Sequence, residues 1–238
     1  MAIAATLAAT LSACGGGGGS APNSTAGYNP AVSGFPIQQA LTYAFTHGMQ
    51  ANLVIGGTAT YGSASYPLSG SLTYTVGGAT NATFEGAAAL KSTESFNATI
   101  SINGQSQPLT MNSPLYLNMQ YAPIGSTDDG SYCVAAGTPV YPVTAVAGQS
   151  GDIVTMNCYA DSTKRTLVDV AKMSYVTTAG SDANSINFQM ITTDYGLTST
   201  PQSTTSITFT ITAAGIPTLT RMQGTMVESG VTVNLDAH

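Results

Sequence analysis

The chain has 238 residues, of which only 7% are charged, and its formal net charge is −6. A nucleic-acid partner needs a basic stripe that displaces counterions from phosphates, and five cations cannot provide one. The composition therefore excludes nucleic-acid binding, and the length fits one large β domain behind a short leader. The five cations are Lys91, Lys164, Arg165, Lys172 and Arg221.

The first segment is a short apolar run, Ile3–Leu11, which is too short to span a bilayer. It leads into Leu11-Ser12-Ala13-Cys14, followed by five glycines. This stretch resembles the lipobox of bacterial lipoproteins. The resemblance implies a signal peptide over 1–13 and lipid attachment at Cys14. The positively charged start of such a peptide is missing, so we expect the true translation start to lie upstream. The alternative is an unprocessed soluble N-terminus.

Residues 14–35 are rich in Gly, Ser and Pro, a composition typical of a flexible tether. In lipoproteins of this kind the residue after the cysteine helps to select the membrane. Gly15 is not the aspartate that resembles an inner-membrane retention signal, so the expected location is the outer membrane. The polyglycine also resembles the leader end of some surface-exposed β-barrel lipoproteins, such as transferrin-binding proteins. The membrane, reached through the lipid on Cys14, is thus the first expected partner.

One helix is predicted near 37–47. Ile37, Leu41 and Phe45 share a face at helical spacing. Pro36 suits the first helical position, and Gly48 suits the end of the helix.

From Asn52 onward, alternation with a period of two residues indicates β-strands. Asn103-Gly104 predicts a tight hairpin, because both residues tolerate positive φ. The connections are too short for the helical crossovers of a parallel sheet. The predicted strands cover 71–76, 96–102, 115–121, 132–135, 153–159, 167–176, 186–194, 206–213, 219–227 and 231–235.

The predicted fold class is therefore all-β. We expect a single antiparallel domain over 36–238, arranged as a curled meander or barrel, since the connections look short and sequential. A β-sandwich is the alternative that the pattern leaves open.

Cys133 and Cys158 can pair in an oxidising compartment, because the lipobox assigns Cys14, the third cysteine, to lipid. The alternative is a pair of buried free thiols.

Catalytic and metal-binding motifs are scarce. His47 is the only histidine before the C-terminal His238, and the helix end around it favours a histidine without any catalytic role. Asp128-Asp129-Gly130 could lend oxygens to calcium, although Asp-Gly is also a turn signal. Glu85 is interpreted as an outward-facing residue rather than a buried acid. We accordingly expect no enzyme activity, no metal and no cofactor.

Tyrosine is abundant, with 12 copies, many of them on predicted strands. Such residues usually belong to the core or to cross-strand pairs, but they can also line a groove for a carbohydrate or an apolar ligand. Two functions follow as expectations. The first is a non-catalytic binding or structural protein of the envelope, with a possible protein or glycan partner. The alternative is a carrier that holds a lipid or another apolar ligand inside a curled sheet.

Overall fold

The computed structural model describes residues 34–128, 130–228 and 230–238. The predicted leader, the lipid-attachment residue Cys14, most of the predicted tether, and Asp129 lie outside the described residues. Phe35, at the end of the predicted tether, is buried and forms a β-bridge with Ala145.

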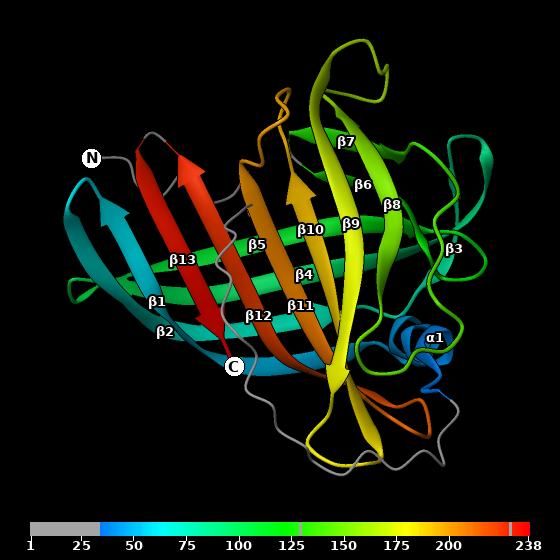
Figure 1. The fold of residues 1–238 in the computed structure, drawn as a ribbon. Helices are drawn as coiled ribbons and strands as arrows, with labels where there is room; N and C mark the ends of the chain where they lie inside the picture. The colour runs from blue at the N-terminus through cyan, green and yellow to red at the C-terminus, as the bar shows by residue number, and fades with distance from the viewer. Residues whose placement is uncertain (1–33, 129, 229) are drawn as a thin grey trace.

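Within these ranges the chain forms one helix and a 13-stranded antiparallel sheet (Figure 1). The helix α1 (Ile37–His47) has the predicted bounds, although Pro36 is its N-cap rather than its first residue. The strands are β1 (Met49–Tyr61), β2 (Ala64–Val76), β3 (Thr80–Phe84), β4 (Ala87–Ile102), β5 (Gln105–Leu117), β6 (Pro123–Asp128), β7 (Ser131–Ala135), β8 (Ser150–Tyr159), β9 (Leu167–Ala179), β10 (Ser185–Asp194), β11 (Ser203–Thr212), β12 (Pro217–Glu228) and β13 (Val231–Ala237).

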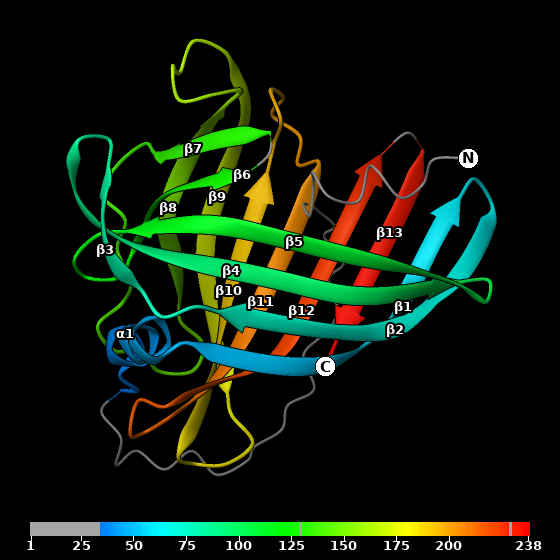
Figure 2. The ribbon, with the colours of Figure 1, turned by 180° about the vertical axis from the view of Figure 1, so that it is seen from behind.

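The sheet closes on itself, which selects a barrel over the alternative sandwich. The strands follow one another in order from β4 to β13, then β13 pairs with β1 and β1 with β2. Residues Leu68–Val76 of β2 pair with Glu94–Ile102 of β4 and complete the ring. The result is a 12-strand antiparallel barrel with β3 as an extra strand. The strands β2, β4 and β5 form one wall and cross β9–β12 of the opposite wall at a steep angle (Figures 1 and 2).

Two glycines allow the backbone to approach closely where the sheet bends. A Cβ on Gly70 would lie 1.9 Å from the carbonyl oxygen of Thr99, and one on Gly57 would lie 2.1 Å from that of Asn234. Both residues have positive φ, of 157° and 142°. Glycine inside a strand commonly marks such a tight bend.

Side chains alternate between an apolar inner face and a polar outer face. In β11, Ile207, Phe209 and Ile211 point inward, while Thr208 and Thr210 point outward. The Thr-rich composition of the sequence thus supplies the outer surface of the barrel, and aliphatic and aromatic residues supply its interior.

One end of the barrel is closed by α1 and by the connection between β7 and β8, residues 136–149. Ile37, Leu41 and Phe45 of α1 are buried in the main hydrophobic core. The connection is held to the N-terminal segment by a hydrogen bond from the Phe35 amide to the Ala145 carbonyl. This is called the helix end below. The opposite end carries the β1–β2, β4–β5 and β12–β13 turns and is called the hairpin end.

Several predicted strand bounds need correction. The strand predicted at 115–121 is the last part of β5, which ends at Leu117. Asn118 ends it, because its side-chain oxygen accepts hydrogen bonds from the amides of Gln120 and Ala122, and Tyr121 has a φ of 63°. No predicted strand corresponds to β1, β3 or β6. The Asn103-Gly104 hairpin is confirmed, with φ of 51° and 75°.

The extra strand β3 lies against the outside of the barrel. The ring of Phe84 stacks on Tyr116 at 4.4 Å and on Tyr132 at 5.5 Å between centroids. Beyond Phe84, the turn residue Glu85 accepts a hydrogen bond of 2.6 Å from the Tyr132 hydroxyl and forms an ion pair with Lys164. These contacts tie the β3–β4 hairpin to β5, to β7 and to the β8–β9 connection.

The structure contains the predicted disulfide. Cys133 in β7 and Cys158 in β8 are directly opposite each other in the ladder and are separated by 25 residues in sequence. A bridge over a loop of that length restricts the unfolded chain and stabilises the fold by about 3.5 kcal/mol.

Replacing both cysteines by Ala should lower the free energy of unfolding by about 3.5 kcal/mol. Denaturant unfolding measures the change, with Cys14 replaced by Ser in both proteins. As a control, a reductant should destabilise the protein that retains Cys133 and Cys158 and leave the double variant unchanged. Equal stability of the two proteins without reductant would contradict the stabilising role of the bridge.

Candidate functional site: the barrel lumen

On β5 and β10, inward-facing side chains become more exposed with distance from the helix end. Along β5, the inward-facing Leu117 is fully buried, Met111 and Leu109 are partly exposed, and Gln107 is exposed. On the opposite wall, Phe188 of β10 is fully buried and Met190 is partly exposed. On these two strands the inward-facing side chains are most buried near the helix end, whereas Leu68 and Ile100 on neighbouring strands are also buried toward the hairpin end. We call the interior of the barrel between the two walls the lumen.

Strand number sets how much space the barrel encloses. A barrel of about eight strands is just wide enough for its own side chains to fill, and diameter grows with strand number. Twelve strands enclose more space than that. The helix α1 fills part of it at one end. On the rest of the inner face lie apolar side chains that are partly buried and pack against the main core: Leu109, Met111, Leu115, Met173, Tyr175, Met190, Ile207 and Val233.

The floor of this lumen is polar. Glu94 of β4 points inward among apolar neighbours and is partly exposed. The side chains of Tyr74 of β2 and Glu94 share a hydrogen bond. Tyr141, from the β7–β8 connection, is buried beside this pair, and its hydroxyl lies 3.7 Å from the Met190 sulfur. We call Glu94, Tyr74 and Tyr141 the lumen floor.

Burial shifts the titration of all three floor residues. It raises the pKa of Glu94, because an enclosed carboxylate loses hydration, and the hydrogen bond with Tyr74 opposes this only in part. Burial, together with the nearby Glu94 carboxylate, also raises the pKa of Tyr74 and of Tyr141. Both tyrosines therefore stay protonated and remain hydrogen-bond donors.

A second pair of carboxyl groups lies on the inner face at the hairpin end. Asp194, at the end of β10, is hydrogen-bonded to Asp169 of β9. The Ser203 hydroxyl donates to Asp194 at 3.2 Å, and the Gly196 amide donates to Asp169 at 2.6 Å. Burial raises the pKa of Asp194 to about 8, and the negative charge of Asp169 adds to the shift. The proton that Asp194 keeps thus lies in its hydrogen bond with Asp169, and the pair attaches the β10–β11 connection to the hairpin end of the lumen.

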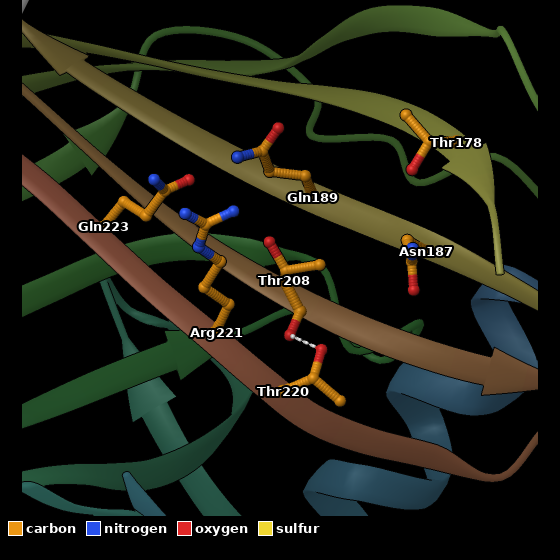
Figure 3. Close-up of a pocket in the computed structure, with 7 residues that line it drawn as sticks. All are labelled: Thr178, Asn187, Gln189, Thr208, Thr220, Arg221 and Gln223. Atoms are coloured by element: carbon orange, nitrogen blue, oxygen red, sulfur yellow. Dashed lines mark hydrogen bonds between the residues drawn. The ribbon is translucent and has the colours of Figure 1, made fainter. Parts of the chain in front are cut away.

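A shallow polar groove of about 370 Å³ lies on the outer surface over β9–β12 (Figure 3). Several of its side chains form hydrogen bonds with neighbouring residues. Arg221 forms a bidentate ion pair with Asp236, at 2.7 and 2.6 Å, and Gln189 donates to Ser206 at 2.9 Å. The register shift of β12 opposite Thr208 and Phe209 forms one side of it. The lining residues are Thr178, Asn187, Gln189, Thr208, Thr220, Arg221 and Gln223.

The candidates taken from the sequence are not brought together. His47 ends α1, where its ring stacks on Tyr43 at 4.2 Å and its Nδ1 lies 3.1 Å from the Tyr43 carbonyl oxygen.

Asp128 accepts hydrogen bonds from the Gly130 amide and the Ser131 hydroxyl, which is turn geometry. Glu85 is exposed, as predicted, and its hydrogen bond with Lys164 lowers its pKa. Within the described ranges, no three His, Cys, Asp or Glu side chains cluster as metal ligands would.

Sequence reasoning missed the carboxylates of the inner face, although a signal was present. The strand predicted at 96–102 places Phe96, Ala98 and Ile100 on one apolar face, and one further step of two residues reaches Glu94. In the same way, Ile186, Phe188 and Met190 share their face with Asp194. In the sequence, the signal for such a residue is a carboxylate that lies an even number of positions from the apolar residues of a strand and so shares their face.

No protein-family model, curated protein or solved structure matches this chain. In the part of the chain that the structure describes, no helix has the length and hydropathy needed to cross a bilayer.

The Asp169–Asp194 pair predicts that stability falls as pH rises. The folded protein keeps the Asp194 proton up to about pH 8, whereas the unfolded chain loses it near pH 4. The stabilising contribution is therefore complete below pH 4 and is lost as pH rises toward 8, by at most about 1.4 kcal/mol per pH unit. Denaturant unfolding between pH 5 and 9 measures the slope.

Asp194→Asn should flatten this slope, because an amide does not titrate. The exposed carboxylate Asp152, which pairs with Lys172 on the outer face, provides a control, and Asp152→Asn should keep the original slope. A slope that Asp194→Asn leaves unchanged would contradict the proton kept by Asp194.

Proposed function

We propose that the protein is a non-catalytic, lipid-anchored protein of the bacterial envelope whose barrel binds an apolar small molecule in its lumen. The observation that supports the lumen function is the partial exposure of apolar side chains on the inner face, among them Met111, Met190 and Ile207. Ligand sites are typically concave, mostly apolar and equipped with a few polar groups. The lumen floor provides such groups.

Partial exposure also favours binding over a purely structural role. A scaffold gains most from a filled interior, because each apolar group withdrawn from water contributes about 25 cal/mol per Å². Here the inward-facing side chains of β5 remain exposed or partly exposed from Met111 to the hairpin end. An apolar ligand would cover that surface and gain the same stabilisation.

The floor also favours binding over catalysis. Tyr74 is engaged with Glu94, and Tyr141 with Met190. Two protonated phenols and a carboxyl group that hold one another in place suit the orientation of a polar end of a ligand. Activation of a nucleophile would instead need a base of matched pKa beside it.

The outer groove is a second candidate, for a glycan or protein partner. Its amide and hydroxyl lining suits sugar hydroxyls. Most of its groups already hold internal partners, so we place the lumen first.

Filling the lumen should abolish ligand binding. Ile207→Trp places a large side chain on the inner face and should weaken the binding of 1-decanol by about tenfold or more, measured by calorimetry. Thr204→Trp, on the outer face of the same strand, is the matched control and should change the affinity by less than about twofold. Failure of the unaltered protein to bind 1-decanol, together with native mass spectra free of co-purified ligand, would overturn the lumen function.

The anchor is tested separately at Cys14. In the host, the precursor should incorporate radiolabelled palmitate and fractionate with the outer membrane. Cys14→Ser should abolish both, because no other residue can replace the acylated sulfur. Cys133→Ala is the control and should still incorporate label. A product of the unaltered gene that stays unlabelled in the cytosol would contradict the anchor.

A further inference from the structure

Glu94 is a carboxyl group on the inner face beside which the described part of the chain places no cation. All five Lys and Arg residues lie on the outer face or in connections. Lys164 pairs with Glu85, Lys172 with Asp152 and Arg221 with Asp236. Lys91 lies over the Tyr116 ring at 5.8 Å, outside the barrel, and Arg165 is exposed in the β8–β9 connection. The lumen therefore contains an acid without a counter-ion.

The titratable groups that face Glu94 are both phenols. Tyr74 shares a hydrogen bond with it from β2, and Tyr141 lies beside it from the β7–β8 connection. Directly opposite on β5 is Ser113, which carries no charge. A carboxylate accepts up to about four hydrogen bonds, so the bond with Tyr74 leaves acceptor capacity toward the lumen.

An ionised carboxylate in such a place is costly without a positive partner, and a partner of opposite charge favours ionisation. A ligand that brings an ammonium group supplies that partner. The resulting bond between two charged groups is roughly twice as strong as a neutral hydrogen bond. A ligand carboxylate would instead add a second negative charge beside Glu94, and an alcohol would add only a neutral hydrogen bond.

We propose that the lumen selects apolar molecules that end in a primary amine, with Glu94 as the counter-ion and Tyr74 holding the carboxylate in position. This inference rests on the proposed lumen function and names the ligand class of that site. The apolar body of the ligand lies along Met111, Met190 and Tyr175, and its ammonium group donates to the free lone pairs of Glu94.

Three probes of equal chain length test the selection: decylamine, 1-decanol and decanoate, below the concentrations at which they form micelles. Calorimetry at pH 7 should give decylamine an affinity about tenfold or more above that of 1-decanol, with decanoate weakest. Equal affinity for all three, or a preference for decanoate, would overturn the amine selection and leave the lumen function standing. Failure of all three to bind overturns the lumen function and this inference with it.

Glu94→Gln keeps the shape of the side chain and removes its charge. It should lower the affinity for decylamine to that for 1-decanol, and change the affinity for 1-decanol by less than about twofold. Asp152→Asn removes one negative charge from the outer face and should leave both affinities unchanged. An amine preference that survives Glu94→Gln would overturn the assignment of Glu94. Should this variant fail to fold, the ranking of the three probes by the unaltered protein decides the proposal.

Discussion

The pairing of β2 with β4 is the constraint on which the whole molecule depends. Every other ladder joins neighbours in sequence, apart from that between β1 and β13, which joins the two ends of the folded chain. The β2–β4 ladder turns this open succession into a ring. It requires the close approach of backbones at Gly70, where any side chain would collide with the Thr99 carbonyl. Closure removes the free sheet edges and fixes how much space the ring encloses.

The alternation in the sequence corresponds to the outer and inner faces of the closed sheet. Threonine, serine and amide side chains face outward, so the protein covers its surface with few charges. The inner face carries carboxyl groups at two places, the lumen floor around Glu94 and the Asp169–Asp194 pair at the hairpin end. Buried carboxyl groups need hydrogen-bond partners, and both groups have them. The polar groups thus lie at the two ends of an apolar lumen, an arrangement suited to orienting a ligand.

The sequence allowed prediction of what depends on local pattern. Helical spacing located α1 at 37–47, and alternation identified an antiparallel domain and most of its strands. The short connections favoured a curled meander or barrel, and the structure confirms the barrel. The closing β2–β4 pairing could not be predicted, because a sandwich has the same alternation. The strand β6 was missed because the turn set by Asn118 interrupts the pattern. Tyr141 comes from a connection without periodicity, so only the folded chain brings it to Glu94.

A lumen accessible to small apolar molecules is the central claim, and xenon tests it most directly. Xenon enters dry apolar cavities without needing a polar partner. A crystal of the protein under xenon pressure should show xenon inside the barrel, in contact with Met111, Met190 and Tyr175. A barrel interior in which side chains occupy this space, with xenon bound only at the outer surface, would contradict the account.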